Sequence, residues 1–247
     1  MNFYVLTLFP EMIENGLNHS IIKKALEKEI ISINTIDIRD FSENKHKQVD
    51  DYAYGGGAGM LMKPEPIFKA FLYAKDKIKK DNTKVLYMTP QGKPFNQKMA
   101  QEFSKETDLI ILCGHYEGID ERVIEEIVTD EISIGDFVLT GGEIPAMAII
   151  DSISRLIPNV LGKEESFINE SFSENLLEYP NYTRPFCFNG KEVPDVLISG
   201  NHKKILDWKR EQSLIRTYKK RPDLLKNANL TEKEKNFLKN KFNYEIN

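Results

Sequence analysis

The sequence predicts an α/β fold built around a mostly parallel sheet, and three observations carry that prediction. Runs that suit strands alternate with segments whose apolar residues recur at helical spacing. Several of these runs are apolar throughout, as strands covered on both faces are. Successive runs lie about 25–30 residues apart, the length of a βαβ unit. Helices are therefore expected on both faces of the sheet.

The first third of the chain begins with an apolar strand over residues 3–8. A helix over residues 11–28 follows, because its apolar residues share one face. Isoleucines alternate with other residues over 31–38, which predicts a second strand. Residues 40–62 are polar and then glycine-rich, so we expect a long loop there. Residues 64–80 return to helical spacing.

The next part of the chain repeats the alternation three times. We expect strands at residues 84–88, 108–113 and 132–139 and helices at residues 96–105, 119–128 and 145–157. A turn at Pro90-Gln91-Gly92 follows the first of these strands. Gly114 breaks the second, and Gly135 lies within the third.

The pattern of the sequence changes after Pro158. Residues 159–200 lack sustained periodicity and read as linker and loops. Ser199 or Asn201 can then cap a helix that runs to about residue 220. Its apolar residues Ile205, Trp208, Ile215 and Tyr218 share a face. Residues 231–234 (TEKE) form a capping-box pattern that opens a last helix.

Charge is divided unevenly along the chain. The net charge is −4, but residues 201–247 hold 13 basic and 6 acidic residues, a balance of +7. Residues 1–200 hold 21 basic and 32 acidic residues, a balance of −11. A basic C-terminal segment suits contacts with the phosphates of a nucleic acid. A solvated helical surface explains the same charges equally well.

Other classes of protein are disfavoured. The N-terminal residues show no secretory signal, and no apolar stretch approaches the roughly 20 residues of a membrane helix. Cys113 and Cys187 are far apart, which favours reduced thiols and a cytoplasmic protein. Neither a G-x-G-x-x-G nor a P-loop pattern occurs. Zinc ligation and a cysteine nucleophile are disfavoured because the histidines are scattered, at His19, His46, His115 and His202.

Three glycine-bearing segments follow strand-like runs, at residues 89–92, 114–118 and 134–143. Ligands of parallel sheets bind at the carboxyl ends of the strands. Glycine lets the backbone approach such a ligand closely. The three segments together suit one adenosyl ligand, whereas each alone is explained as well by a tight turn. The glycine run 55–59 suits either a phosphate contact or a flexible loop.

Seven strings stand in order along nearly the whole chain: TLFPEM (7–12), DDYAYGGGAGM (50–60), CGHYEGIDER (113–122), SIGDFVLTGGE (133–143), DSISR (151–155), YTRP (182–185) and LISGNH (197–202). They resemble the TrmD family of tRNA (guanine-N1)-methyltransferases, which belongs to the SPOUT methyltransferases. The resemblance implies a trefoil-knotted catalytic domain over residues 1–160, a flexible linker over 161–175 and an all-helical tRNA-binding domain over 176–247. It also implies a cytoplasmic homodimer whose active site is shared between subunits.

The resemblance further implies S-adenosylmethionine as methyl donor and N1 of guanosine 37, next to the tRNA anticodon, as acceptor. The C-terminal domain would grip the anticodon arm. Magnesium is implied as a requirement, with no site indicated. The implied donor-binding residues are Tyr87, Met88, Thr89, Pro90, Gln91, Gly92, Gly114, Tyr116, Glu117, Ile134, Gly135, Asp136, Phe137, Val138, Leu139, Gly141, Gly142 and Pro145.

Two residues are implied to act on the guanine. Guanine N1 carries a proton, so methylation needs a base for that proton and a cation near O6. Arg155 matches the arginine of the family, and Glu170 stands where the family has its aspartate base. The glutamate keeps the carboxylate but is one methylene longer. His115, where many relatives have arginine, receives no catalytic role.

Three other functions remain open from the sequence. One is a SPOUT enzyme that methylates another RNA nucleotide, and absence of a carboxylate facing Arg155 would favour it. The second is a non-catalytic RNA-binding protein of the same fold, against which the intact donor-loop strings argue. The third, a nucleotide-dependent oxidoreductase, lacks its fingerprint.

Overall fold

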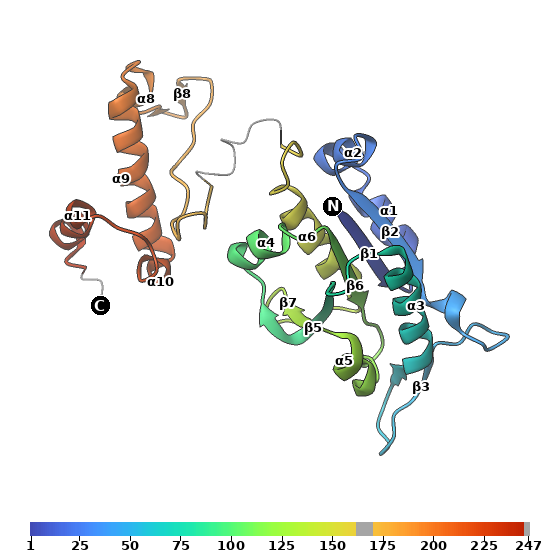
Figure 1. The fold of residues 1–247 in the computed structure, drawn as a ribbon. Coiled ribbons are helices and arrows are strands. Elements are labelled where there is room, and N and C mark those ends of the chain that lie inside the picture. The colour runs from blue at the N-terminus through green and yellow to red at the C-terminus, as the bar shows by residue number, and fades with distance from the viewer. Residues whose placement is uncertain (162–169, 245–247) are drawn as a thin grey trace. The chain divides into compact units, whose positions relative to one another are not determined.

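The computed structural model describes residues 1–161 and 170–244 (Figure 1). The chain divides into two compact units, residues 1–163 and 164–247. Each is described by itself below. Most of the predicted linker, residues 162–169, lies outside the described residues.

The N-terminal unit is built on a five-stranded sheet in which every pairing is parallel. The strand order is β2-β1-β6-β5-β7. This confirms the predicted α/β class. The strands are β1 (Asn2–Thr7), β2 (Ser32–Asp37), β5 (Lys84–Pro94), β6 (Asp108–Cys113) and β7 (Asp130–Ser133).

Helices cover both faces of this sheet, because its strands carry apolar side chains on both sides. In β6, Leu109, Ile111 and Cys113 pack into one core, and Ile110 and Leu112 pack into the other. The first core also contains residues of α1 (Pro10–Leu17), α2 (Ser20–Glu27), α4 (Gln97–Phe103) and α6 (Glu143–Ser154). The second contains residues of α3 (Pro64–Lys77), α5 (Glu121–Ile127) and the short 3-10 helix η1 (Ile38–Phe41).

Two predicted elements differ from the structure. The helix expected over residues 11–28 is two helices, since Asn18 ends α1 and Ser20 opens α2 with a φ of 49°. The loop expected over 40–62 contains a hairpin of β3 (Asp50–Tyr52) and β4 (Met60–Met62). The glycine run at its tip takes positive φ at Gly55, Gly56, Gly57 and Gly59.

Strand β5 also departs from the expected turn at Pro90-Gln91-Gly92. It runs on to Pro94, and its pairing with β7 shifts between Met88 and Lys93, both of which lie opposite Ile132. Residues 89–92 therefore bulge out of the ladder at the carboxyl end of the strand. Strand β7 is shorter than expected and ends at Ser133, before Gly135.

The C-terminal unit is mainly helical, with α8 (Asp195–Ile198), α9 (His202–Lys220), α10 (Pro222–Leu225) and α11 (Glu232–Phe242). Asn201 caps α9, and the predicted capping box of Thr231 and Glu234 is present at α11. The buried residues of α9 are Ser213, Leu214 and Thr217, and the apolar face of Ile205, Trp208, Ile215 and Tyr218 is half-buried. No helix among the described residues is long and apolar enough to cross a membrane.

This unit also has a hairpin that the expected all-helical domain lacked. Strands β8 (Cys187–Phe188) and β9 (Lys191–Glu192) pair antiparallel around Asn189-Gly190. Both turn residues take positive φ, 51° and 72°. An Asn-Gly pair is the preferred sequence for such a two-residue turn.

Candidate functional site

The bulge near the carboxyl end of β5 and the loops that follow β6 and β7 meet at one cavity of about 510 Å3. They converge because these three strands are neighbours in the sheet and run parallel, so their carboxyl ends share an edge. The cavity volume lies within the usual range of about 300–1,000 Å3 for a small-molecule site. The three glycine-bearing segments identified in the sequence thus form one site.

Nearly all the predicted donor-binding residues line this cavity. They are Tyr87, Met88, Thr89, Pro90, Gln91, Gly114, Tyr116, Glu117, Ile134, Gly135, Phe137, Val138, Leu139, Gly141, Gly142 and Pro145. Gly92 and Asp136 are not among the lining residues. Leu61, His115 and Ser133 are, although the sequence analysis did not assign them to the site.

Gly92 supports the cavity from behind. A Cβ at this position would lie 2.4 Å from the backbone nitrogen of Ile132 and 2.5 Å from the carbonyl carbon of Glu131. Both atoms belong to β7, so only glycine lets the bulge after Met88 fold against that strand.

We expect Gly92→Ala to destabilise the N-terminal unit by about 1–3 kcal/mol, because backbone atoms cannot yield as a side chain can. Thermal denaturation measures the effect. Gly16→Ala is the matched control: its Cβ would meet only the end of the Met147 side chain, which can move. Equal melting temperatures for the two variants would show that β7 moves away easily.

Gly141 and Gly142 allow two of the loops to cross closely. A Cβ on Gly142 would lie 2.7 Å from Cα of Cys113, and the Gly142 amide donates to the Gly114 carbonyl at 3.0 Å. A Cβ on Gly141 would lie 2.2 Å from the His115 ring. His115 and Gly141 also form an antiparallel bridge. The loops after β6 and β7 therefore pack directly against each other.

A buried carboxylate lies beneath this crossing. Glu143, the first residue of α6, is 2% exposed. Thr7 Oγ1 donates to Glu143 Oε1 at 2.6 Å, and His115 Nε2 lies 2.6 Å from Glu143 Oε2. The ring of Phe9 contacts the His115 ring in a tilted arrangement, with centroids 4.8 Å apart. Sequence analysis missed this group because Thr7 and Glu143 are 136 positions apart.

Burial also raises the pKa of two titratable side chains in this region. Desolvation, with smaller contributions from Glu131 and Glu121, raises the pKa of Tyr87 to about 12. The Tyr87 hydroxyl therefore keeps its proton throughout the physiological pH range. Burial and, less strongly, the nearby Glu143 raise the pKa of the Cys113 thiol well above its ordinary value.

The burial of Cys113 has a direct chemical consequence. The thiol is fully buried and its thiolate is disfavoured, whereas Cys187 is exposed. We expect a maleimide to label Cys187 alone in the native protein and both cysteines after denaturation. Mass spectrometry of the labelled peptides checks this. Labelling of Cys113 in the folded chain would contradict the burial argument.

The two residues assigned to guanine chemistry lie in different units. Arg155 is the C-cap of α6, and its amide donates to the Asp151 carbonyl at 3.1 Å. Glu170 belongs to the C-terminal unit, where its carbonyl accepts from the Ser173 hydroxyl at 2.7 Å. Their assignment as a catalytic pair stays a prediction.

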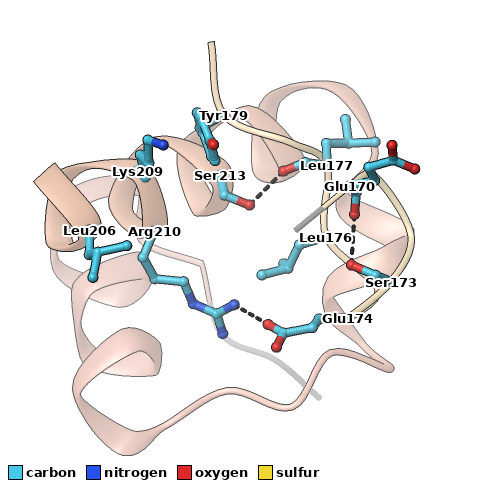
Figure 2. A pocket seen from close by; sticks show the side chains of 10 residues that line it. All are labelled: Glu170, Ser173, Glu174, Leu176, Leu177, Tyr179, Leu206, Lys209, Arg210 and Ser213. Carbon is cyan, nitrogen blue, oxygen red and sulfur yellow. Dashed lines mark hydrogen bonds and ion pairs between the residues drawn. The ribbon is translucent and has the colours of Figure 1, made fainter. Parts of the chain in front are cut away.

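Glu170 borders a second cavity, of about 280 Å3, within the C-terminal unit (Figure 2). Arg210 spans its floor through ion pairs with Glu174 at 2.5 Å and Glu234 at 2.6 Å. Figure 2 shows the Glu170 carboxylate directed away from Arg210. The carboxylate is thus not part of the Arg210 network.

The described part of the chain contains no group of three or more histidine, cysteine or acidic side chains that could hold a metal ion. A magnesium site made by protein side chains alone does not fit these residues. Magnesium commonly binds through one or two carboxylates together with phosphates and water.

Comparison with known proteins identifies the family of this chain. Residues 1–227 match the family model described as tRNA (Guanine-1)-methyltransferase TrmD. A protein of Staphylococcus carnosus is 58% identical over 97% of each chain, and one of Caldanaerobacter subterraneus is 57% identical over 100% of each. A protein of Clostridioides difficile is 58% identical over 93% of this chain and 99% of its own. All three carry the name tRNA (guanine-N(1)-)-methyltransferase.

Proposed function

The chain belongs to the tRNA (guanine-1)-methyltransferase family TrmD, and from this we propose that it methylates N1 of a guanosine in tRNA, with S-adenosylmethionine as donor. The observation that carries the proposal is the cavity where the β5 bulge meets the loops after β6 and β7, in a chain so similar to these enzymes. A tRNA substrate also suggests a cytoplasmic location.

The cavity suits the donor in size and in chemistry. The glycines of the lining segments let the backbone approach a ligand closely, and apolar side chains such as Ile134, Val138 and Leu139 offer contact area. Gly135, with a φ of 149°, and Tyr116, with a φ of 60°, hold the loops in conformations that turn sharply around the site. We propose that the lining residues predicted from the sequence bind the donor.

The proposed reaction is a direct transfer. The bond between the donor sulfur and its methyl carbon breaks as a bond from guanine N1 to that carbon forms, and the N1 proton passes to a base. We propose Glu170 as that base and Arg155 as the cation that stabilises the charge developing on O6. The sulfur leaves uncharged, in S-adenosylhomocysteine.

Further parts of the proposal come from the resemblance. The acceptor is guanosine 37, next to the anticodon, and the C-terminal unit, whose residues 201–247 are basic, grips the anticodon arm. The enzyme is a homodimer, in which Arg155 of one subunit serves Glu170 of the other. The N-terminal unit forms a trefoil knot, and activity requires magnesium.

A single experiment tests the function. The protein is incubated with tRNA transcripts and labelled S-adenosylmethionine, and the product is digested and mapped by mass spectrometry. We expect 1-methylguanosine at position 37 and no transfer when that guanosine is replaced by adenosine. A methyl group on ribose or on another base would identify a different RNA methyltransferase. Donor binding without transfer to any RNA would indicate a non-catalytic protein.

A further inference from the structure

The buried carboxylate of Glu143 has a place in the site that the transfer chemistry does not use. Its two oxygens are both engaged, one by the Thr7 hydroxyl and one by the His115 ring, each at 2.6 Å. A carboxylate 2% exposed is costly to bury unless such partners satisfy it. Neither Glu143 nor Thr7 lines the cavity, whereas His115 does.

We propose that Glu143 and His115 are positioning residues, and that their contact holds the loops after β6 and β7 in the conformation that binds the methyl donor. This inference rests on the proposed function. The two residues come from the two loops themselves, His115 two positions after β6 and Glu143 at the start of α6. Their contact thus ties one wall of the cavity to the other.

The backbone at this crossing cannot hold the loops as firmly alone. One hydrogen bond, from the Gly142 amide to the Gly114 carbonyl, joins the segments beside the His115–Gly141 bridge. The His115 ring lies directly over Gly141, where a Cβ would be 2.2 Å away. The ring therefore fills the space that the glycine leaves, and Glu143 fixes the ring from beneath.

The residue next to His115 needs this restraint. Tyr116 has a φ of 60°, a left-handed conformation that is uncommon for a residue with a bulky side chain. Its side chain lines the cavity and is 47% exposed, so packing alone does not fix it. Such backbone conformations persist only where neighbouring contacts determine them. His115 supplies those contacts: its ring meets Glu143, and its amide donates to the Met62 sulfur at 3.3 Å.

The test separates hydrogen bonding from bulk at position 115. Calorimetry measures the dissociation constant of S-adenosylmethionine for the wild type, His115→Leu and His115→Gln. Leucine fills space but cannot meet the carboxylate, so we expect the dissociation constant to rise about tenfold or more. Glutamine can present an amide N–H to Glu143, so it should restore binding to within about threefold. A residue that only fills space would give the opposite order.

A second variant tests the partner. Glu143→Gln, which removes the charge, should also weaken donor binding, and its effect should not add to that of His115→Leu, because both break one contact. At saturating donor, kcat should change far less than the KM for the donor, since neither group touches the reacting atoms. Ile22→Ala, in the core beneath α2, controls for stability: it should lower the melting temperature without changing the dissociation constant.

The outcomes distinguish the two levels of the proposal. Failure of the wild type to bind S-adenosylmethionine would overturn the proposed function and this inference with it. Wild-type binding together with unchanged affinity in His115→Leu and Glu143→Gln would overturn the inference alone. So would a loss of affinity in Ile22→Ala equal to that in His115→Leu, because affinity would then follow stability.

Discussion

Glu170→Gln will abolish methyl transfer and leave tRNA affinity little changed. An amide cannot accept the proton of guanine N1, and general-base catalysis contributes about 10²–10⁴ in rate. Glutamine keeps the size of the side chain, so contacts that depend on shape survive. Single-turnover transfer of labelled methyl measures the rate, and filter binding measures tRNA affinity.

A second substitution tests the length of the side chain. Glu170→Asp should keep substantial activity, because the resemblance to the family implies an aspartate base at this position. Glu164 and Glu165 are the rival bases, and both lie outside the described residues. Glu165→Gln is the control, because it removes the carboxylate of a rival base. An active Glu170→Gln with an inactive Glu165→Gln would move the base to Glu165.

The backbone of Glu170 is held by hydrogen bonds within the C-terminal unit. The Glu170 carbonyl accepts from both the amide and the hydroxyl of Ser173, at 3.3 and 2.7 Å, in a turn of the C-terminal unit. These bonds hold the backbone of Glu170 in the turn. The residues immediately before it, 162–169, belong to the predicted linker and lie outside the described residues.

Much of the N-terminal unit could be predicted because its strands are short apolar runs separated by amphipathic helices. The run 108–113, for example, is buried on both faces, as its uniform apolarity predicted. The cavity could also be anticipated, because glycine-bearing segments after parallel strands share one edge of a sheet. These segments form one site only if their strands are neighbours in the sheet. The strand order β6-β5-β7 meets this condition.

Contacts between distant residues could not be predicted in this way. Nothing in the local sequence shows that Thr7 and His115 meet Glu143, or that Gly92 lies against the backbone of β7. The bulge after Met88 has the same origin, since it depends on the register with β7. Periodicity reports which face of an element is apolar, but not which residues from other elements lie over it.

The C-terminal unit shows both a success and an overlooked signal. The capping box at Thr231 is a local pattern, so the sequence predicted it correctly. The hairpin at Asn189-Gly190 is equally local and was missed, because strands of two residues show no alternation. The buried residues of α9 could not be identified from its apolar face, because they include Ser213 and Thr217, which hydrogen-bond the Leu177 carbonyl and amide, at 2.5 and 2.8 Å.

Arg155→Ala should lower the rate of methyl transfer by about 10²–10³ while leaving donor affinity unchanged. The charge on guanine O6 develops mainly in the transition state, so a cation that meets it contributes little to ground-state binding. Arg155 ends α6 and is not among the residues lining the donor cavity. Calorimetry with S-adenosylmethionine and single-turnover kinetics measure the two quantities. Donor affinity that falls in step with the rate would make Arg155 a structural residue.

Mixing subunits tests whether the pair is shared across a dimer. Arg155→Ala and Glu170→Gln chains are each expected to be inactive alone. If one chain supplies the arginine and the other the base, a mixed dimer has one complete site, because the intact Arg155 of the Glu170→Gln chain meets the intact Glu170 of its partner. Co-expressed chains with different tags isolate that dimer, which should recover about half of the wild-type activity, one of two sites. An inactive mixed dimer, with both homodimers folded, would place Arg155 and Glu170 within the same chain's site or exclude one of them from it.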